Sequence, residues 1–226
     1  MTRPVVFLAA AIAAALAIFR AIPGLDIAVS ALFYDGTSFP VQQNVWVEGV
    51  RQSLYAAEDI AAIAALLLVM VTLYRRAPVL NLATKDWGFQ LAVFVVGPGV
   101  MANLITKPLW GRARPFRITQ FGGASDFTPV WQWSDQCSAN CSFVSGEMSG
   151  AVALAVALFL TLAANRQRLS PQIFRLGQTL AFSVPVITFW QRIAAGRHFL
   201  SDVVFGGLMV GLIAALLHGA FYRARR

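Results

Sequence analysis

Charged residues are scarce in this 226-residue chain. Asp, Glu, Lys and Arg together make up 12% of it, whereas 58% is hydrophobic, and the mean hydropathy is +0.66. Soluble domains carry about 25% charged residues, so this composition excludes a soluble globular domain of this length. The sequence has no internal repeat, low-complexity tract or appended soluble region. It therefore predicts a single membrane-embedded domain over residues 1–226.

Cysteine and histidine are also rare, with two of each. Cys137 and Cys141 could form a disulfide or remain free thiols, since both forms are compatible with a segment outside the cytoplasm. Neither histidine is near them in the sequence, and two cysteines alone do not make a zinc site. No cluster of carboxylates suits a pair of metal ions. We therefore expect neither a metal ion nor a cofactor.

Long apolar runs, by contrast, are abundant. A helix needs about 20 mostly apolar residues to cross about 30 Å of hydrocarbon. The first run could be a cleavable signal peptide, but it is long for one, and we interpret it as an uncleaved span. The sequence thus predicts an all-α bundle of six transmembrane helices, over residues 4–22, 56–74, 87–105, 148–164, 178–190 and 199–218.

The net charge of +8 would suggest a nucleic acid partner in a soluble protein, but here its distribution follows the predicted spans. By the positive-inside rule, the basic segments before span one, after spans two and four, and after span six are cytoplasmic. Both termini are then inside. The third external connection, between spans five and six, is basic too and breaks the rule. We therefore expect the active site on that outer face.

Three further features are interpreted without a catalytic role. The connection 23–55 is half apolar and is interpreted as an interfacial anchor, the alternative being a flap that gates lipid access. Glu58 and Asp59 are expected to open the second span, where carboxylates suit a helix N-terminus. Asp126 and Asp135 are interpreted as loop residues.

Three segments place charged residues beside external span ends, where an unpaired charge is costly and usually functional. They cover residues 107–115, 143–147 and 192–202. In the third, His198 and Asp202 are four residues apart at the start of a helical pattern and would share one face. The carboxylate could then accept a proton from one imidazole nitrogen, which would make the other nitrogen a better nucleophile.

The same segments supply groups that bind phosphate. Lys107 and Arg114 are seven residues apart, two turns if helical, and with Arg192 they could surround one anion. Arginine offers two-point hydrogen bonding to phosphoryl oxygens, and lysine acts as a point charge. Ser145 and Gly146 would add backbone N–H groups at the start of span four. Fixed donors of this kind can supply most of the catalysis of phosphoryl transfer.

In order and spacing, these segments resemble the three signatures of the type 2 phosphatidic acid phosphatase superfamily, K-x6-R-P, P-S-G-H and S-R-x5-H-x3-D. The first is matched fully, and the third has Gln191 in place of its serine. In the second, Val144 and Glu147 replace the proline and the histidine. The match covers residues 107–202, and a three-part match in this order is specific, whereas a lone R-P would carry no weight.

The resemblance implies a six-helix membrane enzyme with a phosphohistidine intermediate. His198 would attack phosphorus, Asp202 would orient it, and Glu147 would have to replace the histidine that serves the family as general acid. The phosphoryl oxygens would be held by Lys107, Arg114, Ser145, Gly146 and Arg192.

The stretches 110–115, 118–123, 127–129, 134–137 and 140–147 further resemble the bacterial lipid A phosphatase branch, especially enzymes acting on the 4'-phosphate. This implies lipid A as substrate at the periplasmic face of the inner membrane, with no nucleic acid partner. Phosphatidylglycerophosphate, undecaprenyl pyrophosphate and phosphotransfer to another hydroxyl remain alternatives. A transporter is disfavoured, because its cations would lie mid-span. Arg112, Arg117 and Arg197 could contact a second phosphate or sugar, or attract anionic headgroups.

Overall fold

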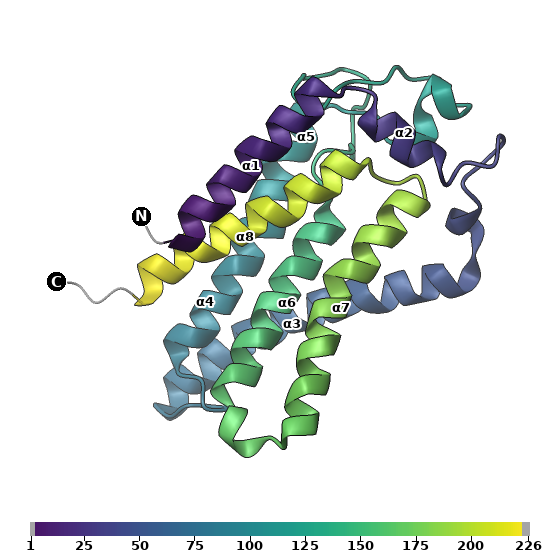
Figure 1. Cartoon of the computed structure of the whole chain (residues 1–226). Coiled ribbons are helices and arrows are strands. Elements are labelled where there is room, and N and C mark those ends of the chain that lie inside the picture. The colour runs from purple at the N-terminus through teal and green to yellow at the C-terminus, as the bar shows by residue number, and fades with distance from the viewer. Residues whose placement is uncertain (1–2, 223–226) are drawn as a thin grey trace.

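The structure, a computed structural model, describes residues 3–222. It contains six helices that are long and apolar enough to cross a membrane, which confirms the predicted all-α fold with six spans. One span is continuous through α4 (Thr84–Phe94), the π-helical η2 (Val95–Thr106) and α5 (Lys107–Trp110). The other five are α1 (Arg3–Ala21), α3 (Val45–Arg75), α6 (Gly146–Ala164), α7 (Pro171–Ala194) and α8 (Leu200–Tyr222) (Figure 1).

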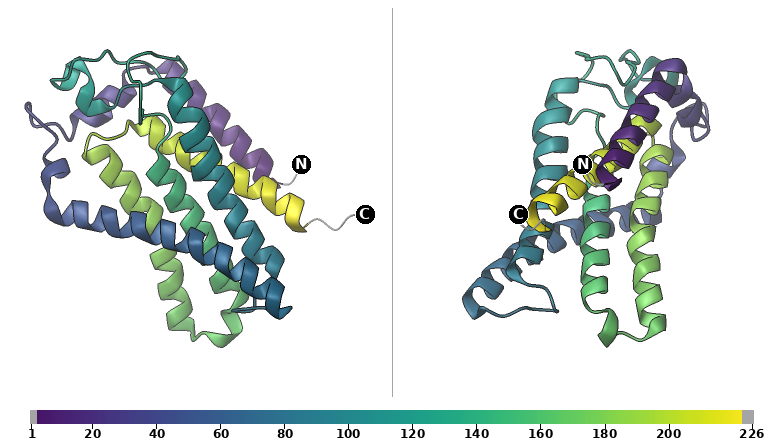
Figure 2. Two further views of the ribbon diagram at one scale, coloured as in Figure 1. Left: turned by 180° about the vertical axis from the view of Figure 1, so that it is seen from behind. Right: turned by 60° about the vertical axis from the view of Figure 1, so that its left-hand side comes forward.

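Helix α6 lies in the middle of the bundle, in contact with α3, α7, α8 and η2. Its buried face is made largely of Ser, Gly and Ala, and such small side chains let helices in a membrane approach closely. A Cβ atom on Gly206 of α8 would lie 2.9 Å from the carbonyl oxygen of Ser145. Helix α3 crosses this core obliquely (Figure 2). The arrangement brings the first turn of α6 beside α3 and α8.

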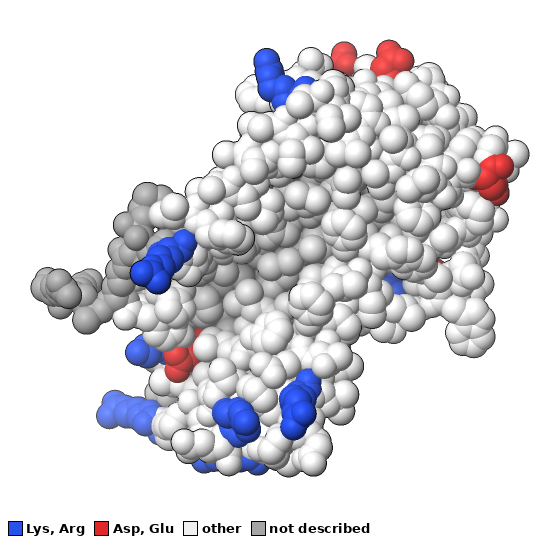
Figure 3. Space-filling view, in the orientation of Figure 1, with Lys and Arg blue, Asp and Glu red and all other residues white. Residues whose placement is uncertain are grey.

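Basic residues gather at the end of the bundle where α6 and α7 are joined (Figure 3). The α3–α4 connection meets that end, because the Asn81 side chain donates to the carbonyl oxygen of Ala164 over 3.2 Å. The arrangement agrees with the charge pattern from which the sidedness was predicted. The three segments with the phosphatase signatures lie at the opposite end of the bundle.

The second span begins earlier than predicted. Helix α3 starts at Val45 rather than at residue 56, and the Asn44 side chain caps it by accepting from two backbone N–H groups. The prediction that Glu58 and Asp59 open this helix is therefore wrong. Both lie well inside it, and the first-turn carboxylate is Glu48. Helix α7 is also longer than the predicted 178–190, with Ser170 as its N-cap.

The connection between α1 and α3 packs over the end of the bundle where the three signature segments lie. It includes α2 (Leu25–Ala31) and η1 (Pro40–Gln43). Phe39 is only 3% exposed and contacts Tyr34 and Phe121, with ring centroids 5.4 and 5.3 Å away. A Cβ on Gly196, which has φ +61°, would lie 2.4 Å from the Phe39 ring. The connection is thus part of the packed structure that holds the loop before α8, and not simply an interfacial anchor.

Candidate active site

A cavity of about 790 Å³ opens at this end of the bundle. It lies between α3, η2, the first turn of α6, the end of α7 and the loop that precedes α8. Residues from all three predicted segments line it. Those from the candidate site are Lys107, Arg114, Gly146, Glu147, Arg192, Arg197 and His198.

Lys107 and Arg114 line the same cavity, although they are not two turns apart on one helix as the sequence suggested. Helix α5 ends at Trp110, and Gly111 adopts φ +58°. A Cβ at Gly111 would lie 1.8 Å from the carbonyl oxygen of Ser134, so a glycine is needed where the two segments pass. Arg114 then lies outside the helix and donates to the backbone oxygen (3.1 Å) and the side-chain oxygen (2.8 Å) of Asn140.

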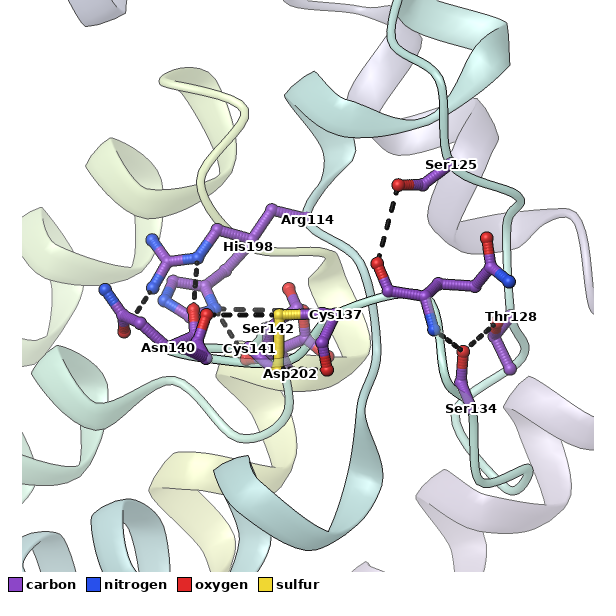
Figure 4. The surroundings of a disulfide bond; sticks show 12 residues. Arg114, Ser125, Thr128, Ser134, Cys137, Asn140, Cys141, Ser142, His198 and Asp202 are labelled. Carbon is purple, nitrogen blue, oxygen red and sulfur yellow. Dashed lines mark hydrogen bonds and ion pairs between the residues drawn. A yellow bond between two sulfur atoms is a disulfide. The ribbon is translucent and has the colours of Figure 1, made fainter.

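His198 precedes α8 and is 2% exposed. Its Nδ1 lies 2.8 Å from the carbonyl oxygen of Ser142 (Figure 4). Since a carbonyl can only accept, Nδ1 carries the proton and Nε2 keeps a free lone pair. Burial lowers the pKa of His198 to about 3, and Arg114 adds to this effect while Asp202 opposes it. The imidazole is therefore neutral near pH 7, which is the form that can act as a nucleophile.

The expected hydrogen bond between Asp202 and His198 is not formed. The Asp202 Oδ2 atom is 3.8 Å from Nδ1 of His198, which is too long. This oxygen accepts instead from the Ser142 hydroxyl (2.5 Å) and from the backbone N–H of Phe199 (2.8 Å). Asp202 therefore acts on the imidazole indirectly, by fixing Ser142, whose carbonyl oxygen bonds to the ring.

Arg112 does not reach the cavity. Its side chain is completely buried and bonds to Asp202 Oδ1 over 2.6 Å and to Asp26 Oδ2 over 2.8 Å. Ser201 joins this cluster through its backbone N–H and its hydroxyl, both of which donate to Asp26. The expectation that Arg112 contacts a headgroup does not fit this burial. Its position makes it a support beneath the segment that carries His198 and Asp202.

Ser145 and Arg117 also lie differently from the expectation. Ser145 is fully buried and caps α6, with its hydroxyl accepting from Met148 N–H and its own N–H donating to the Asp202 carbonyl oxygen. Both groups of Ser145 thus bond within the protein and do not face the cavity, whereas Gly146 does. Arg117 is exposed and lies over the Phe116 ring, while Arg197 lies over the same ring and lines the cavity.

Glu147 is held between two arginines. Its Oε1 atom lies 2.6 Å from Nη1 of Arg192 and 3.2 Å from Nη1 of Arg51. Arg192 also donates to the Gln191 side chain over 2.6 Å. A carboxylate thus occupies a place between guanidinium groups that a phosphoryl oxygen could take.

Helix α3 contributes a stripe of polar residues that the sequence analysis missed. Glu48, Arg51, Tyr55 and Glu58 all line the cavity, and their spacing of three or four residues places them on one face of the helix. The spacing is visible in the sequence. It was overlooked because the helix was expected to start at residue 56.

The chemistry available in the cavity follows from these groups. A neutral imidazole and several cations face one space, which suits attack on a phosphoryl group whose charge the cations would share. Among residues 3–222, no group of three or more His, Cys, Asp and Glu side chains is arranged to hold a metal ion. The groups lining the cavity that can bind an anion are side-chain cations and the N-terminus of α6.

Cys137 and Cys141 form a disulfide, one of the two states the sequence left open. The bridge encloses Asn140, the residue that accepts two hydrogen bonds from Arg114 (Figure 4). Covalent closure of this loop limits the positions that Asn140 can take. The disulfide therefore helps to hold Arg114, one of the cations that line the cavity, through Asn140.

Comparison with known proteins agrees with the motifs and the fold. The family model of the PAP2 superfamily matches residues 87–226. The lipid A 4'-phosphatase of Rhizobium leguminosarum is 30% identical over 90% of both chains. That of Rhizobium etli is 29% identical over 90% of this chain and 82% of its own. That of Francisella tularensis subsp. novicida is 34% identical over 61% of this chain and 59% of its own.

The fold is shared with a solved structure. The PAP2 type phosphatidylglycerolphosphate phosphatase of Bacillus subtilis superposes with a TM-score of 0.58 over the full length of both chains, at 20% sequence identity. At this identity, the likeness concerns the fold alone. The family model and the relatives show that the chain belongs to the PAP2 superfamily.

Proposed function

We propose that this membrane phosphatase removes the 4'-phosphate of lipid A through a phosphohistidine intermediate. The observation that carries the proposal is a single cavity, at one end of six membrane helices, that contains both a neutral imidazole and the cations Lys107, Arg114 and Arg192. The choice of lipid A is supported by the resemblance of residues 110–147 and by the three lipid A 4'-phosphatases among its relatives.

In the first step, Nε2 of His198 forms a bond to phosphorus and the bond from phosphorus to the lipid oxygen breaks. Lys107, Arg114 and Arg192 bind the equatorial oxygens, and the N–H groups at the start of α6 add to this charge stabilisation. The incoming phosphoryl group competes with Glu147 for Arg192. Glu147, freed of part of its ion pairing, takes up a proton from within the cavity and donates it to the leaving oxygen.

In the second step, water attacks the phosphohistidine. Its oxygen bonds to phosphorus, the N–P bond breaks, and the proton lost by the water passes through Glu147 back into the cavity, which restores the proton used in the first step. Inorganic phosphate leaves, and His198 is again neutral with its proton on Nδ1. The Ser142 carbonyl oxygen stabilises the positive charge on the ring while the phosphohistidine exists.

We further propose that the cavity faces the periplasm in the bacterial inner membrane, with both termini in the cytoplasm. The support is the gathering of basic residues at the opposite end of the bundle (Figure 3). Lipid A in the outer leaflet of that membrane would then reach the cavity laterally.

Phosphate release from purified protein tests the proposal. Lipid A, phosphatidylglycerophosphate and undecaprenyl pyrophosphate are each presented in detergent, with and without EDTA, and mass spectrometry identifies which phosphate of lipid A is lost. We expect loss of the 4'-phosphate at an unchanged rate in EDTA. Faster turnover of either other lipid would overturn the substrate, and strict metal dependence would overturn the mechanism. Transfer to an added lipid alcohol would identify a phosphotransferase.

Replacing Glu147 with glutamine should slow hydrolysis of lipid A by about 100-fold, since general acid catalysis contributes about 10²–10⁴-fold. The amide keeps the shape and one acceptor oxygen, so the KM should change much less than kcat. Steady-state kinetics in detergent measure both. Full activity of this variant across the pH range would show that Glu147 is not the proton donor.

Reduction of the Cys137–Cys141 disulfide should raise the KM by up to about tenfold with little change in kcat. Loss of the bridge frees Asn140, and the loss of one hydrogen bond to the charged Arg114 costs about 1.5 kcal/mol, which corresponds to about tenfold. Kinetics with and without dithiothreitol measure the effect. The Cys137→Ser, Cys141→Ser double variant is the control, because its KM should be high in both conditions. An unchanged KM in the reduced wild type would count against a role for the loop.

A further inference from the structure

Glu58 is a buried carboxyl group that the mechanism above does not use. It projects from the middle of α3 into the cavity and is 7% exposed. Within residues 3–222, no hydrogen bond or ion pair is formed by its side chain, in contrast to Glu147 with its two arginines. A buried, unpaired carboxyl inside a membrane protein is usually functional.

Glu58 and Glu147 are close neighbours. The Glu58 Oε2 atom lies 2.0 Å from where a Cβ on Gly150 would be, and Gly150 follows Glu147 by three residues on α6. Residues three apart on a helix have Cβ atoms about 5–6 Å apart. The absence of a side chain at Gly150 thus makes room for a second carboxyl group within about one helical turn of the first.

Two neighbouring carboxyl groups, one of them buried, are not both ionised without a large repulsion, and such pairs commonly share one proton. The two arginines fix the negative charge on Glu147. Glu58 has no cation of its own and lies against the backbone of α6. The proton of the pair therefore belongs on Glu58 in the enzyme without substrate.

We propose that Glu58 and Glu147 form a catalytic carboxyl pair in which Glu58 stores the proton that Glu147 delivers to the leaving oxygen. The inference rests on the proposed phosphatase function and deepens it. When the phosphoryl group binds Arg192, Glu147 loses part of its ion pairing and takes the proton from Glu58. Glu147 then gives it to the lipid oxygen as the P–O bond breaks. The water that attacks the phosphohistidine returns a proton to the pair, so the cycle balances.

The leaving group provides the test. An alkoxide needs a proton as it departs, whereas p-nitrophenolate does not. Glu58→Gln should lower kcat/KM for octyl phosphate by about 100-fold and for p-nitrophenyl phosphate by less than about threefold. Glu147→Gln should give the same pattern. Because the two residues act as one unit, the double variant should be no slower than the slower single variant. Asp126→Asn, an exposed change of carboxyl to amide, should leave both rates unchanged.

Several outcomes would overturn the pair. These are full activity of Glu58→Gln on octyl phosphate, equal losses on both substrates, or losses that multiply in the double variant. If Glu58→Gln does not fold, Gly150→Ala displaces the carboxyl group without removing it and should reproduce the leaving-group pattern. Both probes lack a sugar, so wild-type turnover of them without turnover of lipid A would refute the proposed substrate and leave this proposal standing.

Discussion

Replacing His198 with glutamine should reduce phosphate release by about 10⁴-fold, because the loss of a catalytic nucleophile typically removes the covalent route altogether. Glutamine can still donate to the Ser142 carbonyl oxygen through its amide, so the loop before α8 should keep its position. The buried Asp202 remains bonded to Arg112 and Ser142. The defect is therefore expected in kcat, with substrate binding largely preserved.

Two measurements separate the loss of a nucleophile from a loss of folding. Denaturing the wild type in alkali during turnover of lipid A carrying ³²P should trap labelled protein, because the N–P bond survives alkali but not acid, and the variant should trap none. Thermal unfolding in detergent should be similar for both. His218→Gln is the matched control, since His218 is the other histidine of the chain, exposed near the far end of α8 and stacked on Tyr222. A variant at His198 that retains a tenth of the wild-type rate would rule out the phosphohistidine.

Hydropathy located the membrane spans because a bilayer imposes both length and apolarity on a helix. It failed at the start of α3, where Glu48 and Arg51 interrupt the apolar run. These side chains face a polar cavity and pair with each other over 2.5 Å. A hydropathy average does not distinguish a charge that lines a cavity from one in a loop. The periodicity of the stripe carries that information, as its spacing of three and four residues places it on one helix face.

Motif order and topology together predicted that residues of the three segments meet at one end of the bundle, and those proposed as catalytic line one cavity. The partners of these residues were not predictable. Arg112 bonds to Asp26 and Asp202, which are 86 and 90 positions away in the chain, and nothing near Asp26 in the sequence marks it. The spacing of His198 and Asp202 suggested a direct contact. The predicted hydrogen bond is not formed, because α8 begins only at Leu200 and the histidine lies outside the helix.

These partners explain how a loop residue can be held for catalysis. Asp26 lies on α2, Arg112 in the loop after α5, and Asp202 in the first turn of α8. The guanidinium group of Arg112 therefore joins three chain segments. Asp202 also bonds to the Ser142 hydroxyl, and the Ser142 carbonyl oxygen bonds to the His198 ring, so Asp202 holds the ring through Ser142. Precise placement of a nucleophile requires such support from the residues behind it.

Replacing Arg112 with methionine should destabilise the fold by about 3–5 kcal/mol, the usual effect of removing one partner from a buried ion pair. The carboxylates of Asp26 and Asp202, 2% and 0% exposed, would face each other without the cation between them. Methionine occupies a similar volume, so the cost would come from charge and not from a cavity. Denaturant or thermal unfolding in detergent measures the change.

Arg117→Met is the matched control, because Arg117 is exposed and its loss should change stability by no more than about 0.5 kcal/mol. Arg112→Lys keeps the charge but replaces a planar group that bonds in two directions with a single ammonium. It should fall between the other two variants and show reduced kcat, since a lysine cannot hold both carboxylates in their present positions. Equal stability of the Arg112→Met and Arg117→Met variants would mean that the buried cluster does not hold the three segments together.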